Sequence, residues 1–223
     1  MVNLTSSTIS PSNNIAIAQW QTATWEDYIN ACEDPTLESA RIFFYEGYLL
    51  IDMGNEGINH ARFNNLLTLV FGFWFTSKGG QAFDDLGGCV IEKPNVGGGA
   101  PDRVLYVGGN FPQWQTGEPR KINLDKWRVP DLVCEIADTT LATDLDEKKR
   151  LYAALKVPEY WVVDIKGERV LAFRLQENGK YQECEFSGVM EGLPIALLSE
   201  TLKMLAQGNG MAAMWFAQQI ATL

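Results

Sequence analysis

Acidic side chains and one lysine in the middle of the chain have types and spacing that could support metal-dependent hydrolysis. In the segment DLVCEI, Asp131 and Glu135 point to the same face of a predicted strand, because side chains alternate along an extended chain. The same spacing also fits the solvent-facing side of an edge strand. The pair alone is therefore compatible with either a functional site or the solvent-facing side of a strand.

Lys148 lies in the middle of the apolar stripe of a helix predicted from Leu145 to Lys156. At about 100° per residue it falls between Leu155 and Tyr152. An ammonium group that faces a core is poorly hydrated unless carboxylates receive it or its proton is lost. Lys148 is therefore a site candidate, and the alternatives are a structural buried ion pair or a lysine that reaches water at the rim of the core.

Asp102 follows Pro101 after three consecutive glycines and precedes a predicted strand at Arg103–Val107. A Pro-Asp pair is also common in turns. Together with Glu135, however, Asp102 could bind Mg²⁺ or Mn²⁺, which acidifies a bound water and polarises a phosphoryl oxygen. Lys148 could orient that water or offset the negative charge that develops. This constellation predicts hydrolysis of phosphodiester bonds.

The overall charge opposes a broad, nonspecific grip on nucleic acid, since 18 Lys and Arg against 28 Asp and Glu give a net charge of −10. Four separated cysteines and a single histidine argue against a zinc site or a disulfide framework, so oxygen atoms are the expected metal ligands. A local group of cations could still attract DNA. The nearest candidates in sequence are Arg103, Lys121, Lys126 and Arg128.

The chain predicts a mixed α/β fold with a central mixed sheet flanked by helices. A hydrophobic share of 46% and a charged share of 21% are typical of a globular protein. Residues 1–22 are predicted to form a flexible tail and residues 23–223 a single domain. No apolar run approaches the ~20 residues of a membrane span, and the polar N-terminus lacks signal-peptide features. We therefore expect a cytoplasmic protein without a membrane partner.

The expected elements follow from periodicity and from residues that begin or end helices and strands. Gly97–Gly99 is predicted as a loop, and the segment from Leu202 as weakly helical. The others are a helix at Trp25–Cys32 capped by Thr24, two strands within 42–53, a helix from Ile58 to the glycines at 79 and 80, strands at Asp131–Ile136 and Tyr160–Ile165, a helix at Leu145–Lys156 capped by Asp144, and a hairpin turning at Asn178 and Gly179.

Several of these segments resemble one protein family. PDLVCEI (130–136) and TDLDEKKRLYAALKVPEYWVVDIKGERV (143–170) closely resemble the Uma-two family of restriction-endonuclease-like proteins, members of the PD-(D/E)xK nuclease superfamily. YEGYLL, the histidine at position 60 and APDRVLYV resemble earlier parts of the family pattern. The likeness runs from about Trp25 to Phe186 and implies a restriction-endonuclease-like fold that acts on DNA.

The resemblance also implies roles for individual residues. Asp102 and Glu135 would bind the metal, with Glu46 and Asp131 beside them as further acidic groups. The superfamily lysine usually stands two residues after the strand glutamate, where this chain has an alanine, and Lys148 matches a lysine that has migrated to the following helix. The family's Ser-Pro-Ser turn is replaced here by Asp-Thr-Thr at 138–140.

Two interpretations of function remain. The first is a Mg²⁺- or Mn²⁺-dependent DNA endonuclease, for which a homodimer is plausible because many enzymes that cut both strands are two-fold symmetric. The second is a catalytically inactive protein of the nuclease fold that binds DNA or another protein. A paired-carboxylate glycosidase does not fit, because Asp131 and Glu135 are ~13 Å apart on a strand. His60 is interpreted as a core or capping residue rather than a general base.

Overall fold

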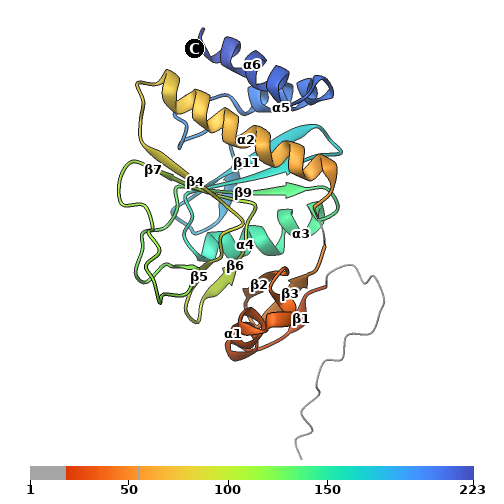
Figure 1. Cartoon of the computed structure of the whole chain (residues 1–223), viewed down its shortest axis with the longest axis vertical. Helices are drawn as coiled ribbons and strands as arrows, with labels where there is room; N and C mark the ends of the chain where they lie inside the picture. The colour runs from red at the N-terminus through yellow and green to blue at the C-terminus, as the bar shows by residue number, and fades with distance from the viewer. Residues whose placement is uncertain (1–18, 55) are drawn as a thin grey trace, which may run out of the picture.

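Two six-stranded sheets and the helices packed against them form the computed structural model, which describes residues 19–54 and 56–223 (Figure 1). The first sheet has the order β1 (Gln21–Thr22), β3 (Tyr48–Asp52), β2 (Arg41–Tyr45), β6 (Gly97–Gly99), β5 (Ile91–Lys93) and β8 (Ile122–Asn123). The second has the order β12 (Tyr181–Glu183), β11 (Arg169–Leu175), β10 (Glu159–Asp164), β9 (Leu132–Ala137), β7 (Arg103–Val107) and β4 (Phe83–Gly87).

The helices form layers on both sides of the second sheet (Figure 1). On one face lie α2 (Ile58–Ser77), α5 (Ile195–Lys203) and α6 (Asn209–Ile220). Between the second sheet and the first lie α3 (Leu141–Leu145) and α4 (Glu147–Ala154), while α1 (Trp25–Glu33) packs on β2 of the first sheet. Short 3-10 turns occur at Pro35–Leu37 and Met204–Gln207. The mixed α/β prediction is confirmed, with two sheets instead of one.

Strand β9 lies inside the second sheet, parallel to β10 and antiparallel to β7. All six of its residues are buried. Leu132, Cys134 and Ile136 face the core beneath α2, whereas Val133 and Ala137 face the core shared with α4. The predicted alternation is confirmed. Because β9 is covered on both faces, the alternative of a wet edge strand is wrong.

The helix predicted at 145–156 is α4, which begins later, at Glu147, because the backbone breaks at Asp146 (φ −120°, ψ −85°), and Leu145 ends the preceding helix α3. Asp144 is therefore no N-cap: it lies in the last turn of α3 and is fully buried. Its carboxylate accepts a hydrogen bond from Thr140 and lies 2.8 Å from the Lys148 ammonium. A buried ammonium requires carboxylate partners, and this requirement outweighs the local preference of aspartate for a cap.

The three glycines at 97–99 form a buried strand, β6, and not the predicted loop. A Cβ atom on these residues would overlap with side chains packed against the strand: Leu151 at Gly97, Tyr28 at Gly98 and Phe43 at Gly99. Glycine is needed here because neighbouring side chains approach the backbone closely. The position of β6 is thus set by close packing against α4, α1 and the neighbouring strand β2.

Other predicted elements are confirmed, with small shifts at their ends. Thr24 caps α1 in a capping box with Asp27. At the hairpin between β11 and β12, only Gly179 has a positive φ, of 76°. Most of the predicted tail lies outside the described residues, but Gln21 and Thr22 at its end pair with β3. None of the helices in the described ranges combines the length and apolarity of a membrane span.

Candidate active site

Glu135 is the central side chain of a buried cluster of charged groups. It points from the middle of β9 toward α4 and is 1% exposed. Its Oε2 atom lies 2.9 Å from Arg41 Nη2 and 3.2 Å from Lys148 Nζ, and Oε1 accepts a hydrogen bond from the Tyr152 hydroxyl. Burial raises the pKa of Glu135 to about 7, although Lys148 and Arg41 act to lower it. Its charge therefore changes near neutral pH.

Asp102 lies just before β7 and beside Glu135, and is 3% exposed. Its Oδ1 atom is 3.0 Å from Arg41 Nη1 and 3.1 Å from His60 Nε2, and Oδ2 accepts a hydrogen bond of 2.6 Å from the Ile136 backbone. Burial acts to raise the pKa of Asp102, but the contacts with His60 and Arg41 outweigh it and lower the pKa. Asp102 is thus an anion at neutral pH.

Lys148 projects from α4 into the same cluster, with its side chain 2% exposed. Nζ lies 3.2 Å from Glu135, 2.8 Å from Asp144 and 4.3 Å from the centre of the Phe43 ring. Burial alone lowers the pKa of Lys148, but the two carboxylates more than offset this effect and raise it. The predicted inward orientation is confirmed, and the amine is held in its charged form.

His60, in the first turn of α2, links the cluster to the protein surface. Nε2 contacts Asp102, while Nδ1 lies 3.6 Å from the half-exposed carboxylate of Glu56 and has no hydrogen-bond partner among the described residues. Burial lowers the pKa of His60, but Asp102 and Glu56 outweigh it and raise the pKa. One atom from each of Glu56, His60 and Asp102 lies within 4.8 Å of the others, so this trio could hold a metal ion.

The structure brings together three of the five predicted site residues, Asp102, Glu135 and Lys148. The other two lie elsewhere. Glu46 is exposed in the turn between β2 and β3, where it accepts a hydrogen bond from Tyr45. Asp131, just before β9, accepts hydrogen bonds of 2.7 Å from the Val107 backbone and 2.8 Å from Arg128, so it ties β9 to the neighbouring segments. Neither carboxylate has a hydrogen bond or ion pair with the cluster among the described residues, and the expectation that both stand beside the metal ligands stays a prediction.

Sequence reasoning missed four members of the cluster. His60 had been interpreted as a core or capping residue and Tyr152 as core, and both contact the site carboxylates. Arg41 and Asp144 had no assigned site role. A usable signal existed for Asp144 alone: it stands four residues before Lys148, which is the spacing of an ion pair along a helix.

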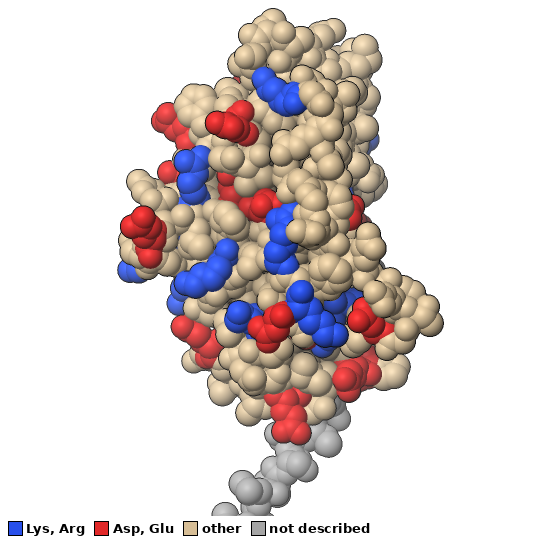
Figure 2. Space-filling view, turned by 90° about the vertical axis from the view of Figure 1, so that its left-hand side faces the viewer, with Lys and Arg blue, Asp and Glu red and all other residues tan. Residues whose placement is uncertain are grey.

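The four cations predicted as DNA contacts form no free basic surface, because each is paired with a carboxylate. The pairs are Arg103 with Asp85 at 3.2 Å, Lys121 with Glu92 at 2.9 Å, Lys126 with Glu118 at 3.7 Å, and Arg128 with Asp131 at 2.8 Å. On the face drawn in Figure 2, blue and red side chains are interspersed. This face carries no broad field of one sign.

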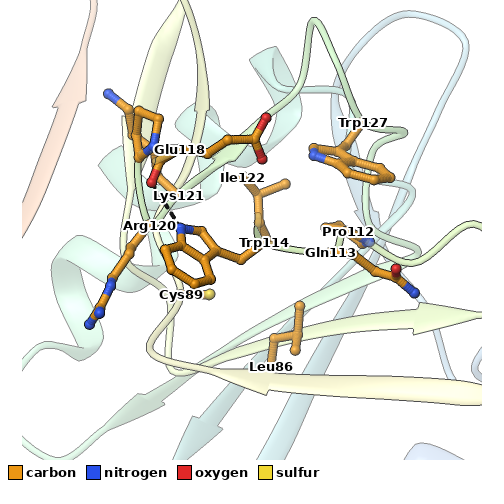
Figure 3. A pocket seen from close by; sticks show the side chains of 11 residues that line it. Leu86, Cys89, Pro112, Gln113, Trp114, Glu118, Arg120, Lys121, Ile122 and Trp127 are labelled. Carbon is orange, nitrogen blue, oxygen red and sulfur yellow. Dashed lines mark hydrogen bonds between the residues drawn. The ribbon is translucent and has the colours of Figure 1, made fainter. Parts of the chain in front are cut away.

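A separate groove of about 390 Å³ lies along the segment between β7 and β8. Trp114 and Trp127 lie on two sides of it, with Leu86 and Ile122 between them (Figure 3). The Arg120 guanidinium stacks on Trp114, at 5.5 Å from the ring centre. None of the residues that line this groove belongs to the charged cluster, so the groove is no part of the candidate active site.

The acidic pair and lysine on a mixed sheet flanked by helices define the nuclease-like class of fold, and comparison with known proteins agrees. The family model described as "Putative restriction endonuclease" (Uma2) matches residues 25–206, so the chain belongs to this family. A crystal structure titled a "putative nuclease belonging to DUF820", from Anabaena variabilis, is similar in fold, with a TM-score of 0.55 and 17% identity over 80% of this chain and 98% of that one. No curated protein matched the sequence.

Proposed function

We propose that this protein is a metal-dependent DNA endonuclease of the restriction-enzyme type that hydrolyses phosphodiester bonds. Family and fold indicate a restriction-endonuclease-like nuclease, and the buried cluster supports the finer assignment. The observation that carries it is that Asp102, Glu135 and Lys148 come from separate parts of the chain and meet in one buried cluster. Arg41 contacts both carboxylates there, and Lys148 contacts Glu135. Burying this many charged groups costs stability, and such clusters are common at functional sites.

The donor set fits a hard divalent ion, Mg²⁺ or Mn²⁺. Asp102 and Glu135 supply carboxylate oxygens, and Glu56 supplies a third at the exposed side. The imidazole of His60, whose Nδ1 lacks a hydrogen-bond partner in the described chain, adds a nitrogen donor that suits Mn²⁺ better than Mg²⁺. When bound, such an ion supplies an acidified water and a Lewis acid for the phosphoryl oxygen.

Lys148 acts as a fixed positive charge in this proposal. Its raised pKa keeps the amine protonated at neutral pH, so it does not remove a proton from water. It instead offsets the negative charge that develops on the phosphate, at a position fixed by Glu135 and Asp144.

Cleavage of supercoiled plasmid and of short duplexes in Mg²⁺ or Mn²⁺ tests the proposal. We expect cleavage that EDTA abolishes and that Asp102→Asn removes. A linear product without a nicked intermediate would indicate concerted cutting of both strands, as by a homodimer. No cleavage of any DNA by the wild-type protein in either metal would contradict the proposal.

A second candidate is a catalytically inactive protein of the same fold that binds DNA or a protein. The specific observation in its favour is the pairing of every predicted DNA-contact cation with a carboxylate, in a chain of net charge −10. Calorimetric titration with Mg²⁺ and Mn²⁺ separates the two candidates. Heat of binding supports the enzyme, and its absence at millimolar metal favours the binding protein.

A further inference from the structure

Arg41, at the start of β2, holds both candidate metal ligands with a single guanidinium group. Nη1 lies 3.0 Å from Asp102 Oδ1, and Nη2 lies 2.9 Å from Glu135 Oε2. Nε and Nη2 also donate to the carbonyl of Ala100, at 3.0 and 2.8 Å, which fixes the plane of the group. The guanidinium therefore occupies the position between the two carboxylates.

Every carboxylate oxygen of Asp102 and Glu135 already has a donor. The oxygens that Arg41 does not contact accept hydrogen bonds from the Ile136 backbone and the Tyr152 hydroxyl. The two oxygens that Arg41 contacts each have a second donor, His60 on Asp102 Oδ1 and Lys148 on Glu135 Oε2, so both of their lone pairs are occupied. An ion that bridges these two oxygens must replace a donor on each. Arg41 is the donor that they share, so its departure frees one lone pair on Asp102 and one on Glu135 together.

Arg41 is also the cation of the cluster that can leave. Its side chain is 25% exposed, whereas that of Lys148, on α4, is only 2% exposed. A divalent ion placed beside both cations would be repelled by each at short range and in a poorly hydrated site. Turning Arg41 toward solvent removes the nearer repulsion and exposes two carboxylates that are otherwise almost completely covered.

We propose that Arg41 is an internal competitor of the divalent ion: its guanidinium neutralises Asp102 and Glu135 in the metal-free protein and turns outward when an ion binds. The proposal rests on the metal site of the proposed function and adds how loading of that site is controlled. The nitrogens of Arg41 stand 2.9–3.0 Å from the carboxylate oxygens, whereas Mg²⁺ binds oxygen at about 2.0–2.1 Å. The two carboxylates therefore move closer together when the ion replaces the arginine.

Calorimetric titration of the full chain with Mn²⁺ at pH 8 tests this competition. We expect Arg41→Gln to bind Mn²⁺ about tenfold more tightly or better, and Arg41→Lys, whose single ammonium cannot bridge both carboxylates, to fall in between. The matched control is Arg169→Gln, because Arg169 contacts a single carboxylate, Asp164, at 2.9 Å and is 53% exposed; its affinity should be unchanged.

Thermal unfolding supplies a readout independent of activity. The metal-free Arg41→Gln protein should melt at a lower temperature than the wild type, and Mn²⁺ should raise its melting temperature by more. Equal or weaker Mn²⁺ binding by both Arg41 variants would overturn the competition while leaving the metal site intact. No Mn²⁺ binding by any variant would overturn both proposals, whereas tighter binding without DNA cleavage would keep the competition and contradict only the nuclease.

Discussion

The carboxylate of Asp144 lies 2.8 Å from the ammonium of Lys148, and both side chains are almost completely buried. The pair spans the break between α3 and α4, so the end of one helix fixes a side chain on the next. Lys148 reaches Glu135 on its other side at 3.2 Å. A lysine held between two carboxylates cannot leave the core without exposing uncompensated negative charge, and this explains its fixed position.

Replacing Lys148 with methionine should lower the rate of catalysis strongly. Methionine fills similar space but removes the charge that the proposed function assigns to the phosphate, and loss of one such group lowers kcat by about 10²–10³. Single-turnover cleavage of a labelled duplex measures the effect. The control is Lys149→Met, since the neighbouring amine lies on the Phe173 ring at 3.5 Å and outside the cluster. Equal rates for Lys148→Met and wild type would exclude the proposed role.

Asp144→Asn should change how cleavage depends on pH. Asparagine keeps the size of the side chain but removes one of the two carboxylates that raise the pKa of Lys148, so this pKa falls. The basic limb of the pH–rate profile should move to lower pH, a shift that a purely structural role would not cause. Asp146→Asn is the control, because Asp146 is exposed and pairs with exposed Arg150. Superimposable profiles for Asp144→Asn and wild type would contradict a positioning role.

Glu135 should make the metal-free protein less stable as the pH rises through neutrality. Its folded pKa of about 7 exceeds the usual value of 4.5, so between these values the folded state binds more protons than the unfolded state. Stability from this group is present below about 4.5 and lost as pH rises through about 7. Urea unfolding at pH 5 and pH 8 should show a smaller pH effect in Glu135→Gln. His60, whose pKa is also raised, contributes in the same direction in both proteins, and an unchanged pH effect would contradict the assignment.

The packing around β6 predicts opposite effects of two glycine substitutions. Gly98→Ala should lower the free energy of unfolding by about 1–3 kcal/mol, because the added methyl group would overlap with the Tyr28 ring. Gly72→Ala, on α2, meets nothing within 4 Å and should raise stability by about 0.5–1 kcal/mol through helix propensity. Chemical denaturation of both variants measures the difference. A neutral Gly98→Ala would show that α1 is not closely packed against β6 there.

Periodicity along the chain was enough to predict the elements that carry the site. The apolar spacing predicted α2, alternation predicted the two faces of β9, and the helical wheel predicted that Lys148 points inward. These are local patterns, in which each residue is compared with others a few positions away. Their agreement with the structure explains why three of the five predicted site residues lie together.

The rest of the cluster depends on contacts between distant parts of the chain. Arg41 reaches Glu135 across 94 positions, and no local pattern marks an arginine at a strand entrance as the partner of a later glutamate. The N-cap prediction for Asp144 was wrong for another reason. The capping rule considers only the local sequence, whereas Asp144 is buried beside the ammonium of Lys148. The roles of Glu46 and Asp131 beside the metal rest on the family resemblance, and the hydrogen-bond partners of the two side chains include Tyr45 and Arg128, which lie outside the cluster.

The helix α6 lies outside residues 25–206, which match the family model, yet it packs along α2. Phe216 and Ile220 share a core with the buried face of α2, and Asn209 donates to the carbonyl of Arg62, two residues after His60. Helix α6 therefore supports α2, the helix that carries His60. A substitution in this peripheral helix could therefore shift α2, and His60 with it, without changing any residue that contacts the two candidate carboxylates.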